Sequence, residues 1–201
     1  GVTGVQTCAL PIYFAAIDSS EHQQLAMEAA LQSIVLLQNQ NNLLPLDKNA
    51  KQSIAVIGPH MDAREALMSN YHGDRCGCPG NGGDYSCIES PLEAIKRTMK
   101  FPEQVQSVKG CDVNGFNTLE FEKAKELAEN SDTVILVLGI DGYLESEGLD
   151  RVPTTLPDLQ AALMETVLDV AGERTIIVLI HGGTISLGDV RDKAEIGRAH
   201  V

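Results

Sequence analysis

The segment "TVILVLGI", residues 133–140, predicts a strand that is buried on both faces. It is a short continuous run of β-branched and apolar residues that ends in glycine and isoleucine, whereas a half-exposed strand would alternate with polar residues. "SIAVIG" at 53–58 and "TIIVLIHGG" at 175–183 have the same character, and "IVLLQN" at 34–39 and "QVQSVKG" at 104–110 predict weaker extended segments. The sequence therefore predicts a sheet whose central strands are covered on both sides.

Apolar residues recur with helical spacing in the stretches around these strands. The four helical segments are residues 19–33, 90–99, 118–131 and 157–172. The expected caps and boundary residues are Ser19 or Ser20 for the first helix, Pro91 for the second, Thr118 or Asn117 for the third, and Pro157 and Gly172 for the fourth. Because parallel strands need crossover connections, this alternation predicts an α/β fold with a mostly parallel sheet sandwiched by helices.

The composition indicates one compact domain and limits the classes of partner. The chain has 201 residues, 43% of them hydrophobic, and a formal net charge of −13. No stretch approaches the roughly 18 consecutive apolar residues of a membrane helix, so we expect no membrane partner. The negative charge is spread along the chain, which argues against a nucleic-acid partner because phosphate binding needs clustered Lys and Arg. An acidic surface suits a neutral substrate.

The two ends of the chain are set apart from the predicted domain. Residues 1–12, which contain "VTGVQTCALPI", and residues 196–201, "IGRAHV", look like a translated sequencing adapter read from its two strands. A disordered natural terminus would explain either end alone but not both together. We therefore expect residues 13–195 to be an α/β domain taken from a longer protein, and the lack of a leader peptide carries no information.

Three cysteines lie in the glycine-rich insert "CGCPGNGGDYSC", residues 76–87, and a fourth is Cys111. A disulfide would order such an insert by limiting its unfolded freedom. Zinc is the rival interpretation, but CxC with one further cysteine lacks the paired CxxC spacing of structural zinc sites, and free thiols stay open as a third. A disulfide predicts an extracellular or secretory-pathway location, and no metal is expected.

The acidic stretch "DGYLESEGLDR", residues 141–151, directly follows the most apolar strand. Ligands approach parallel sheets at the carboxyl ends of their strands, so this stretch is the candidate functional site. Glu145 and Glu147 could be a solvated surface loop, a Ca²⁺ or Mg²⁺ site, or a general acid and base, and the spacing alone leaves all three open. Gly148 would allow a tight turn there.

His60 and His181 also follow strands, where histidine is more often structural than catalytic. No phosphate-binding loop of the form GxGxxG or GxxxxGK[ST] occurs, and no cofactor is expected.

Longer motifs point to a known family. The segment "AALQSIVLLQNQNNLLPLD" resembles the opening of the second domain of family-three glycoside hydrolases, and "IAVIGPHMDA", "LMSNYHG" and "SPLEAI" resemble the landmarks that follow. "ESEGLDRVPTTLPDLQAALMETV" is similar to the family's acid/base loop and the helix after it, most of all in the β-xylosidase and β-glucosidase branch. "TIIVLIHGG" resembles the next strand. The motifs occur in the family's order over most of residues 13–191.

The resemblance implies the α/β-sandwich domain of a retaining β-glycosidase that removes terminal β-D-xylosyl or β-D-glucosyl residues. In that family an aspartate nucleophile belongs to a preceding (β/α)8 barrel, which this chain does not encode, and the sandwich domain supplies the glutamate acid/base. The partners implied are therefore a β-linked carbohydrate and the barrel domain, and the chain alone should be inactive. A non-catalytic carbohydrate-binding or scaffolding domain is the alternative, since fold does not dictate chemistry.

Alignment on "EGxDR" selects Glu147 as the acid/base, with Glu145 as the second candidate. Asp150 and Arg151 are the candidate substrate-binding residues, and fixing the loop or contacting the barrel is the alternative role for both. Asn70 and Tyr71 match the family's "NY.G" landmark, and both a structural role and a substrate contact stay open for them.

Overall fold

A computed structural model describes residues 18–68, 76, 84–188 and 194–200. The chain divides into two units, residues 1–34 and 35–201, and each is described by itself. In the first unit, helix α1 spans Ser20–Ser33, and the Ser19 side chain caps it by accepting a hydrogen bond from the backbone N–H of His22. Of the two predicted caps, Ser19 is therefore the one observed.

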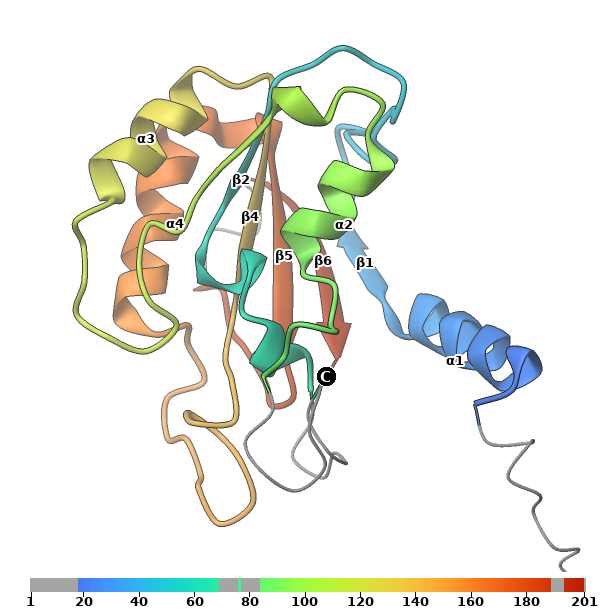
Figure 1. The fold of residues 1–201 in the computed structure, drawn as a ribbon. Coiled ribbons are helices and arrows are strands. Elements are labelled where there is room, and N and C mark those ends of the chain that lie inside the picture. The colour runs from blue at the N-terminus through green and yellow to red at the C-terminus, as the bar shows by residue number, and fades with distance from the viewer. Residues whose placement is uncertain (1–17, 69–75, 77–83, 189–193, 201) are drawn as a thin grey trace, which may run out of the picture. The chain divides into compact units, whose positions relative to one another are not determined.

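The second unit is built on a six-stranded sheet with the strand order β1-β6-β5-β4-β2-β3 (Figure 1). Its strands are β1 Val35–Gln38, β2 Ile54–Ile57, β3 Val105–Val108, β4 Thr133–Gly139, β5 Thr175–His181 and β6 Glu195–His200. Every neighbouring pair is parallel except β1 with β6, which is antiparallel. The mostly parallel α/β sheet predicted from the alternation of strands and helices is confirmed.

Strand β4 lies between β2 and β5, and all seven of its residues are buried. Successive side chains of a strand point to opposite faces, and here both faces are covered. Leu136 and Leu138 pack into the cluster on one face, while Ile135 and Val137 pack into the cluster on the other. The unbroken apolar run in the sequence is thus the consequence of two cores that share one strand.

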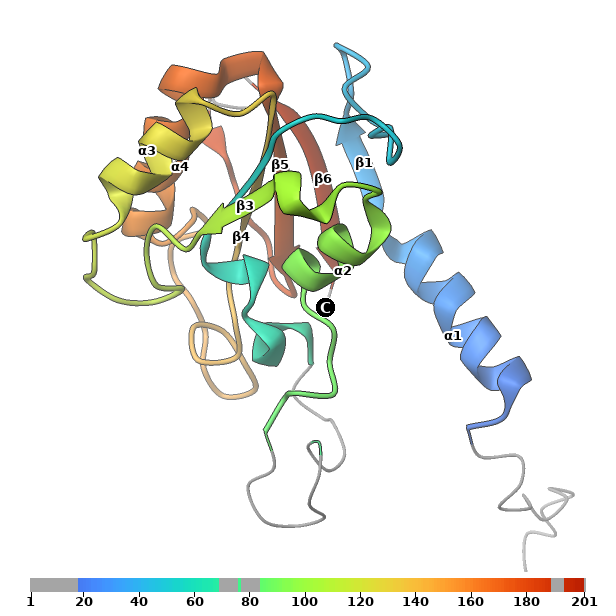
Figure 2. The same cartoon turned by 45° about the horizontal axis from the view of Figure 1, so that its top comes forward.

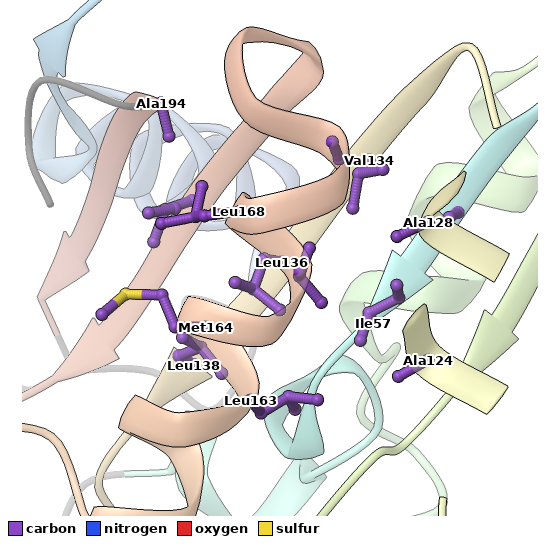
Figure 3. Packing of buried hydrophobic residues seen from close by; sticks show 14 of the residues in the cluster. Ile57, Ala124, Ala128, Val134, Leu136, Leu138, Leu163, Met164, Leu168 and Ala194 are labelled. Carbon is purple, nitrogen blue, oxygen red and sulfur yellow. The ribbon is translucent and has the colours of Figure 1, made fainter. Parts of the chain in front are cut away.

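Helices cover the two faces of the sheet. Helices α3 (Phe121–Glu129) and α4 (Asp158–Ala171) lie side by side on one face, and α2 (Pro91–Thr98) lies on the other (Figures 1 and 2). Figure 3 shows Leu163, Met164 and Leu168 of α4 directed onto the strands, beside the small Ala124 and Ala128 of α3. Small residues on α3 allow that helix to approach the sheet closely. Within the described residues, no helix has both the length and the apolar character needed to cross a bilayer.

The helix boundaries agree with the sequence at α2 and α4 but not at α3. Pro157 and Gly172 flank α4 as predicted. The prediction of Thr118 or Asn117 as the cap of α3 is wrong, because the residue before α3 is Glu120 and no side chain caps it. The carboxamide of Asn117 instead accepts from the backbone N–H of Leu119, closing a turn that delays the start of the helix.

The cysteine-rich insert contains a disulfide between Cys76 and Cys87, so the prediction of a disulfide in this segment is confirmed. Cys78 lies outside the described residues. Cys111 is a free, buried thiol in the segment after β3, and burial raises its pKa to about 12. Cys111 therefore packs as a small apolar side chain.

The sequence pattern predicts no strand at β6, Glu195–His200, because residues 196–201 look like adapter sequence. The structure pairs β6 with β5 and β1 through backbone hydrogen bonds, which any residue other than proline can make. Its first residue, Glu195, is buried, and its carboxylate accepts from the backbone N–H groups of Gln40 and Asn41. The origin of residues 1–12 and 196–201 stays a prediction.

Gln160 connects α4 to the carboxyl end of β4. Its side chain is fully buried; Oε1 accepts from the N–H of Gly139 at 2.9 Å, and Nε2 donates to the carbonyls of Gly139 and Val113, each at 2.8 Å. We expect Gln160→Met to lower the free energy of unfolding by about 2–4 kcal/mol, because these backbone groups would stay buried without partners. Equilibrium urea unfolding measures this loss. Glu165→Met, at an exposed position of the same helix, should change stability by less than about 0.5 kcal/mol, and equal losses would contradict the prediction.

Candidate functional site

The acidic segment, residues 141–151, leaves the carboxyl end of β4 at the edge where the parallel strands β2 and β5 also end. Figure 1 shows this gold to orange loop extending beyond the sheet. Parallel sheets present ligand sites at this edge, since connecting loops from several strands meet there. The acidic segment therefore lies at the sheet edge predicted for it, and its role as a functional site stays a prediction.

A tight turn forms the tip of the acidic segment. The backbone N–H of Ser146 donates to the carbonyl of Leu149 at 3.0 Å, and the N–H of Leu149 donates back to Ser146 at 2.9 Å. Glu147 and Gly148 are the two central residues, and Gly148 has a φ of +75°. The turn expected from Gly148 is thus present, and it leaves the side chain of Glu147 exposed.

Glu145 occupies a different environment two residues earlier. Its Oε2 lies 3.2 Å from Nε of Arg151, and the Arg151 side chain is only 9% exposed. The guanidinium also donates to the backbone carbonyls of Thr155 and Thr184, each at 2.6 Å. Glu145 is therefore partly buried and paired with an arginine, whereas Glu147 and Asp150 are exposed.

Two further carboxyl groups that the sequence did not single out are Asp141, at the start of the segment, and Glu65, beside it. Burial raises the pKa of Asp141, and the nearby negative charge of Glu65 adds to that rise. Glu65 belongs to a short 3₁₀ helix, Arg64–Leu67, and its Oε1 accepts from the hydroxyls of Tyr85, at 2.8 Å, and Tyr143, at 3.2 Å. Glu65 thus joins the acidic segment to the segment that carries Cys87. Asp141 could have been found from its place directly after the strand, but nothing in the sequence marked Glu65.

A cavity of about 680 Å³ opens beside this junction. Its lining includes Asp62, Arg64, Glu65, Tyr85 and Asp141. Most of the residues that line this cavity are charged or polar, which suits a ligand rich in hydroxyl groups. Among the residues that the structure describes, no three histidine, cysteine or acidic side chains are grouped so that they could hold a metal ion.

The two histidines that follow strands make structural contacts. His60 is completely buried, and its Nε2 lies 3.2 Å from the carbonyl oxygen of Ile140. Burial lowers the pKa of His60 from 6.5 to about 4, so the ring is neutral near pH 7 and Nε2–H donates to Ile140. His181 Nδ1 contacts the carbonyl oxygen of Gly183. Asn70 and Tyr71 lie outside the described residues.

The buried His60 predicts a loss of stability in acid. Between pH 6.5 and pH 4 the unfolded chain binds a proton that the folded chain does not, so stability falls as the pH falls through this window. At pH 4.5 the loss from this group alone should be about 2.5 kcal/mol relative to pH 7.5. Urea unfolding at both pH values should show a smaller difference for His60→Asn than for the wild type. NMR of labelled histidines should find His60 neutral at pH 5.5, and a ring already protonated there would contradict the prediction.

Comparison with known proteins places this site in a family. The sequence model of the glycosyl hydrolase family 3 C-terminal domain matches residues 34–196, a stretch that includes the whole acidic segment. The chain belongs to glycosyl hydrolase family 3. The family resemblance inferred from the motifs is thereby confirmed.

Several family 3 relatives are named as β-xylosidases. The chain is 34% identical to probable beta-D-xylosidase 7 of Arabidopsis thaliana over 89% of its length and 22% of that protein. It is 34% identical to a beta-xylosidase of Formosa agariphila over 87% of its length and 23% of that protein. The chain therefore spans less than a quarter of the length of these two relatives.

Solved structures agree with the fold. A family 3 exo-beta-xylosidase, XlnD, in complex with a xylobiose aziridine probe has a TM-score of 0.70 and 28% identity, over 89% of this chain and 22% of that one. The beta-glucosidase of Listeria innocua in complex with glucose has a TM-score of 0.72 over 92% of this chain and 24% of that one. At 22% identity, the second likeness concerns the fold alone. The roles of Glu147, Glu145, Asp150 and Arg151 stay predictions.

Proposed function

We propose that this domain is the part of a retaining β-glycosidase that supplies the general acid/base, and that the enzyme removes terminal β-D-xylosyl residues in preference to β-D-glucosyl residues. Family 3 membership and relatives named as β-xylosidases support the reaction and the sugar. The observation that carries the proposal is the exposed Glu147 at the tip of a hydrogen-bonded turn on the carboxyl edge of the sheet.

The proposed reaction needs a second carboxylate from outside this chain. In retaining hydrolysis, one carboxyl group protonates the glycosidic oxygen while another attacks the sugar, and the first group then deprotonates the water that releases the product. The two carboxyl groups stand about 5 Å apart. The nucleophile would belong to the (β/α)8 domain implied by the family resemblance, and the cysteine disulfide supports an extracellular or secretory-pathway location for the whole enzyme.

Glu147 suits the acid/base role better than Glu145. A proton donor that serves a bond held by another domain must project from its own domain, and the Glu147 side chain does so at the turn tip. Glu145 is engaged by Arg151, and the two side chains are 30% and 9% exposed. The ion pair with Arg151 keeps the Glu145 carboxylate against its own domain, away from a bond that another domain holds.

The test is the activity and stereochemistry of the full-length enzyme. We expect it to hydrolyse 4-nitrophenyl β-D-xyloside faster than the matching β-D-glucoside, and ¹H NMR should detect the β-anomer of xylose as the first product. The chain of 201 residues alone should hydrolyse neither substrate. Initial release of the α-anomer would overturn the retaining mechanism. Xylo-oligosaccharide binding without any hydrolysis would favour the non-catalytic carbohydrate-binding alternative.

A further inference from the structure

The loop that follows β5 is fastened to the acidic segment by several contacts. The backbone N–H of Ser186 donates to the carbonyl of Thr154 at 2.7 Å, and Thr155 and Ser186 form a parallel bridge. Arg151 adds its hydrogen bond to the carbonyl of Thr184. The segments that leave the two neighbouring strands β4 and β5 are therefore one connected unit at the carboxyl edge of the sheet.

Arg151 makes three contacts in three directions. Nε faces the Glu145 carboxylate, Nη1 donates to the carbonyl of Thr155, and Nη2 donates to the carbonyl of Thr184. The planar guanidinium can serve all three acceptors at once, whereas the single ammonium of lysine cannot span them. The Arg151 side chain is only 9% exposed, and all three of its nitrogen atoms contact protein groups.

Gly183 provides the space in which the Glu145 carboxylate lies. A Cβ atom added at Gly183 would stand 1.7 Å from Oε1 of Glu145 and 2.6 Å from Oε2. Any side chain at position 183 would therefore force the carboxylate away from its place. Glu145 can lie there only because residue 183 has no Cβ atom.

We propose that Arg151 and Gly183 are positioning residues that hold Glu145 and thereby fix the turn carrying Glu147. This inference rests on the proposed function. Glu145 directly precedes the turn that begins at Ser146, and Arg151 follows the turn at its other end. We call Glu145, Arg151 and Gly183 the clamp. The clamp connects both ends of the turn to the loop that follows β5. A proton donor displaced by about 1 Å can lose about 10²-fold in rate, so the clamp sets the efficiency of proton transfer.

The experiment compares two substrates within one preparation of the full-length enzyme. Dinitrophenyl β-D-xyloside has a leaving group that needs no proton, whereas phenyl β-D-xyloside needs one. The ratio of kcat/KM for the first substrate to that for the second does not depend on the fraction of enzyme that is folded. We expect Arg151→Lys and Gly183→Ala each to raise this ratio by about 10-fold to 100-fold.

The matched control is Arg97→Lys. Arg97 pairs with Glu89 at 2.6 and 2.8 Å on the outer side of α2, far along the chain from the site, so its substitution should leave the ratio unchanged. A double variant, Gly183→Ala with Glu147→Gln, should raise the ratio no further than Glu147→Gln alone, because both changes impair the same proton transfer.

The outcomes separate this inference from the proposed function. A wild-type ratio in Arg151→Lys and Gly183→Ala, with a raised ratio in Glu147→Gln, would overturn the clamp and leave the acid/base role standing. A raised KM for both substrates in Arg151→Lys with an unchanged ratio would also overturn it, in favour of direct substrate binding by Arg151. An unchanged ratio in Glu147→Gln would overturn the proposed function and the clamp together.

Discussion

Glu147→Gln should slow the hydrolysis of phenyl β-D-xyloside by the full-length enzyme by about 10²- to 10⁴-fold, the range that a positioned general acid contributes. Glutamine keeps the size of the side chain but has no proton to donate to the glycosidic oxygen. Glycosylation by dinitrophenyl β-D-xyloside should be almost unaffected, because its leaving group departs without protonation. The measurement is kcat/KM on both substrates, with Glu147→Ala assayed in the presence and absence of azide. Azide should restore activity by replacing the water that Glu147 activates.

Two controls make the result specific to Glu147. Glu145→Gln weakens the ion pair with Arg151, so any loss it causes should be smaller and should not respond to azide. Glu173→Gln removes an exposed carboxylate at the amino end of β5, the opposite edge of the sheet, and should behave as the wild type. Wild-type kinetics in both Glu147→Gln and Glu145→Gln would show that the acidic segment is a surface loop without an acid/base role.

Gly139→Ala should destabilise the domain by about 4 kcal/mol or more, which is a large part of the stability of an ordinary domain. Gly139 ends the central strand β4 with a φ of +155°, and an added Cβ would lie 1.8 Å from the backbone carbonyl oxygen of Ile180 in β5. Relief would require β4 and β5 to separate next to the site. Circular dichroism during thermal and urea unfolding should show a chain that is largely unfolded at 37 °C.

The matched control is Gly172→Ala at the end of α4. Gly172 also has a positive φ, +49°, but an added Cβ would meet no atom within 4 Å. This substitution should cost about 1–3 kcal/mol, because a φ of +49° with a ψ of −124° is a backbone conformation that alanine rarely adopts. Equal losses in the two variants would show that backbone conformation, not the approach of β5, sets the effect at Gly139.

The sequence determined the features that depend on local pattern. An apolar run such as residues 133–140 is buried on both faces wherever it lies in a sheet, so the central strands and the parallel α/β class could be predicted. Pro157 and Gly172 act on the backbone beside them, and for that reason the bounds of α4 were also predictable. The order of the motifs was enough to predict the family. The position of the acidic segment directly after the most apolar strand was enough to predict the candidate site.

Only the tertiary structure decided how far each glutamate of that site is buried. Glu145 and Glu147 are two residues apart and chemically identical, yet one lies against Arg151 and Gly183 and the other is exposed. Arg151, which pairs with Glu145, donates to the carbonyl of Thr184 in the loop after β5, more than 30 residues further along the chain. Hydrogen bonds between distant segments leave no periodic trace in the sequence. Local sequence pattern was therefore enough to predict the strands and the acidic loop. The environment of each glutamate depends on the packing of β4 beside β5, which brings the two loops together.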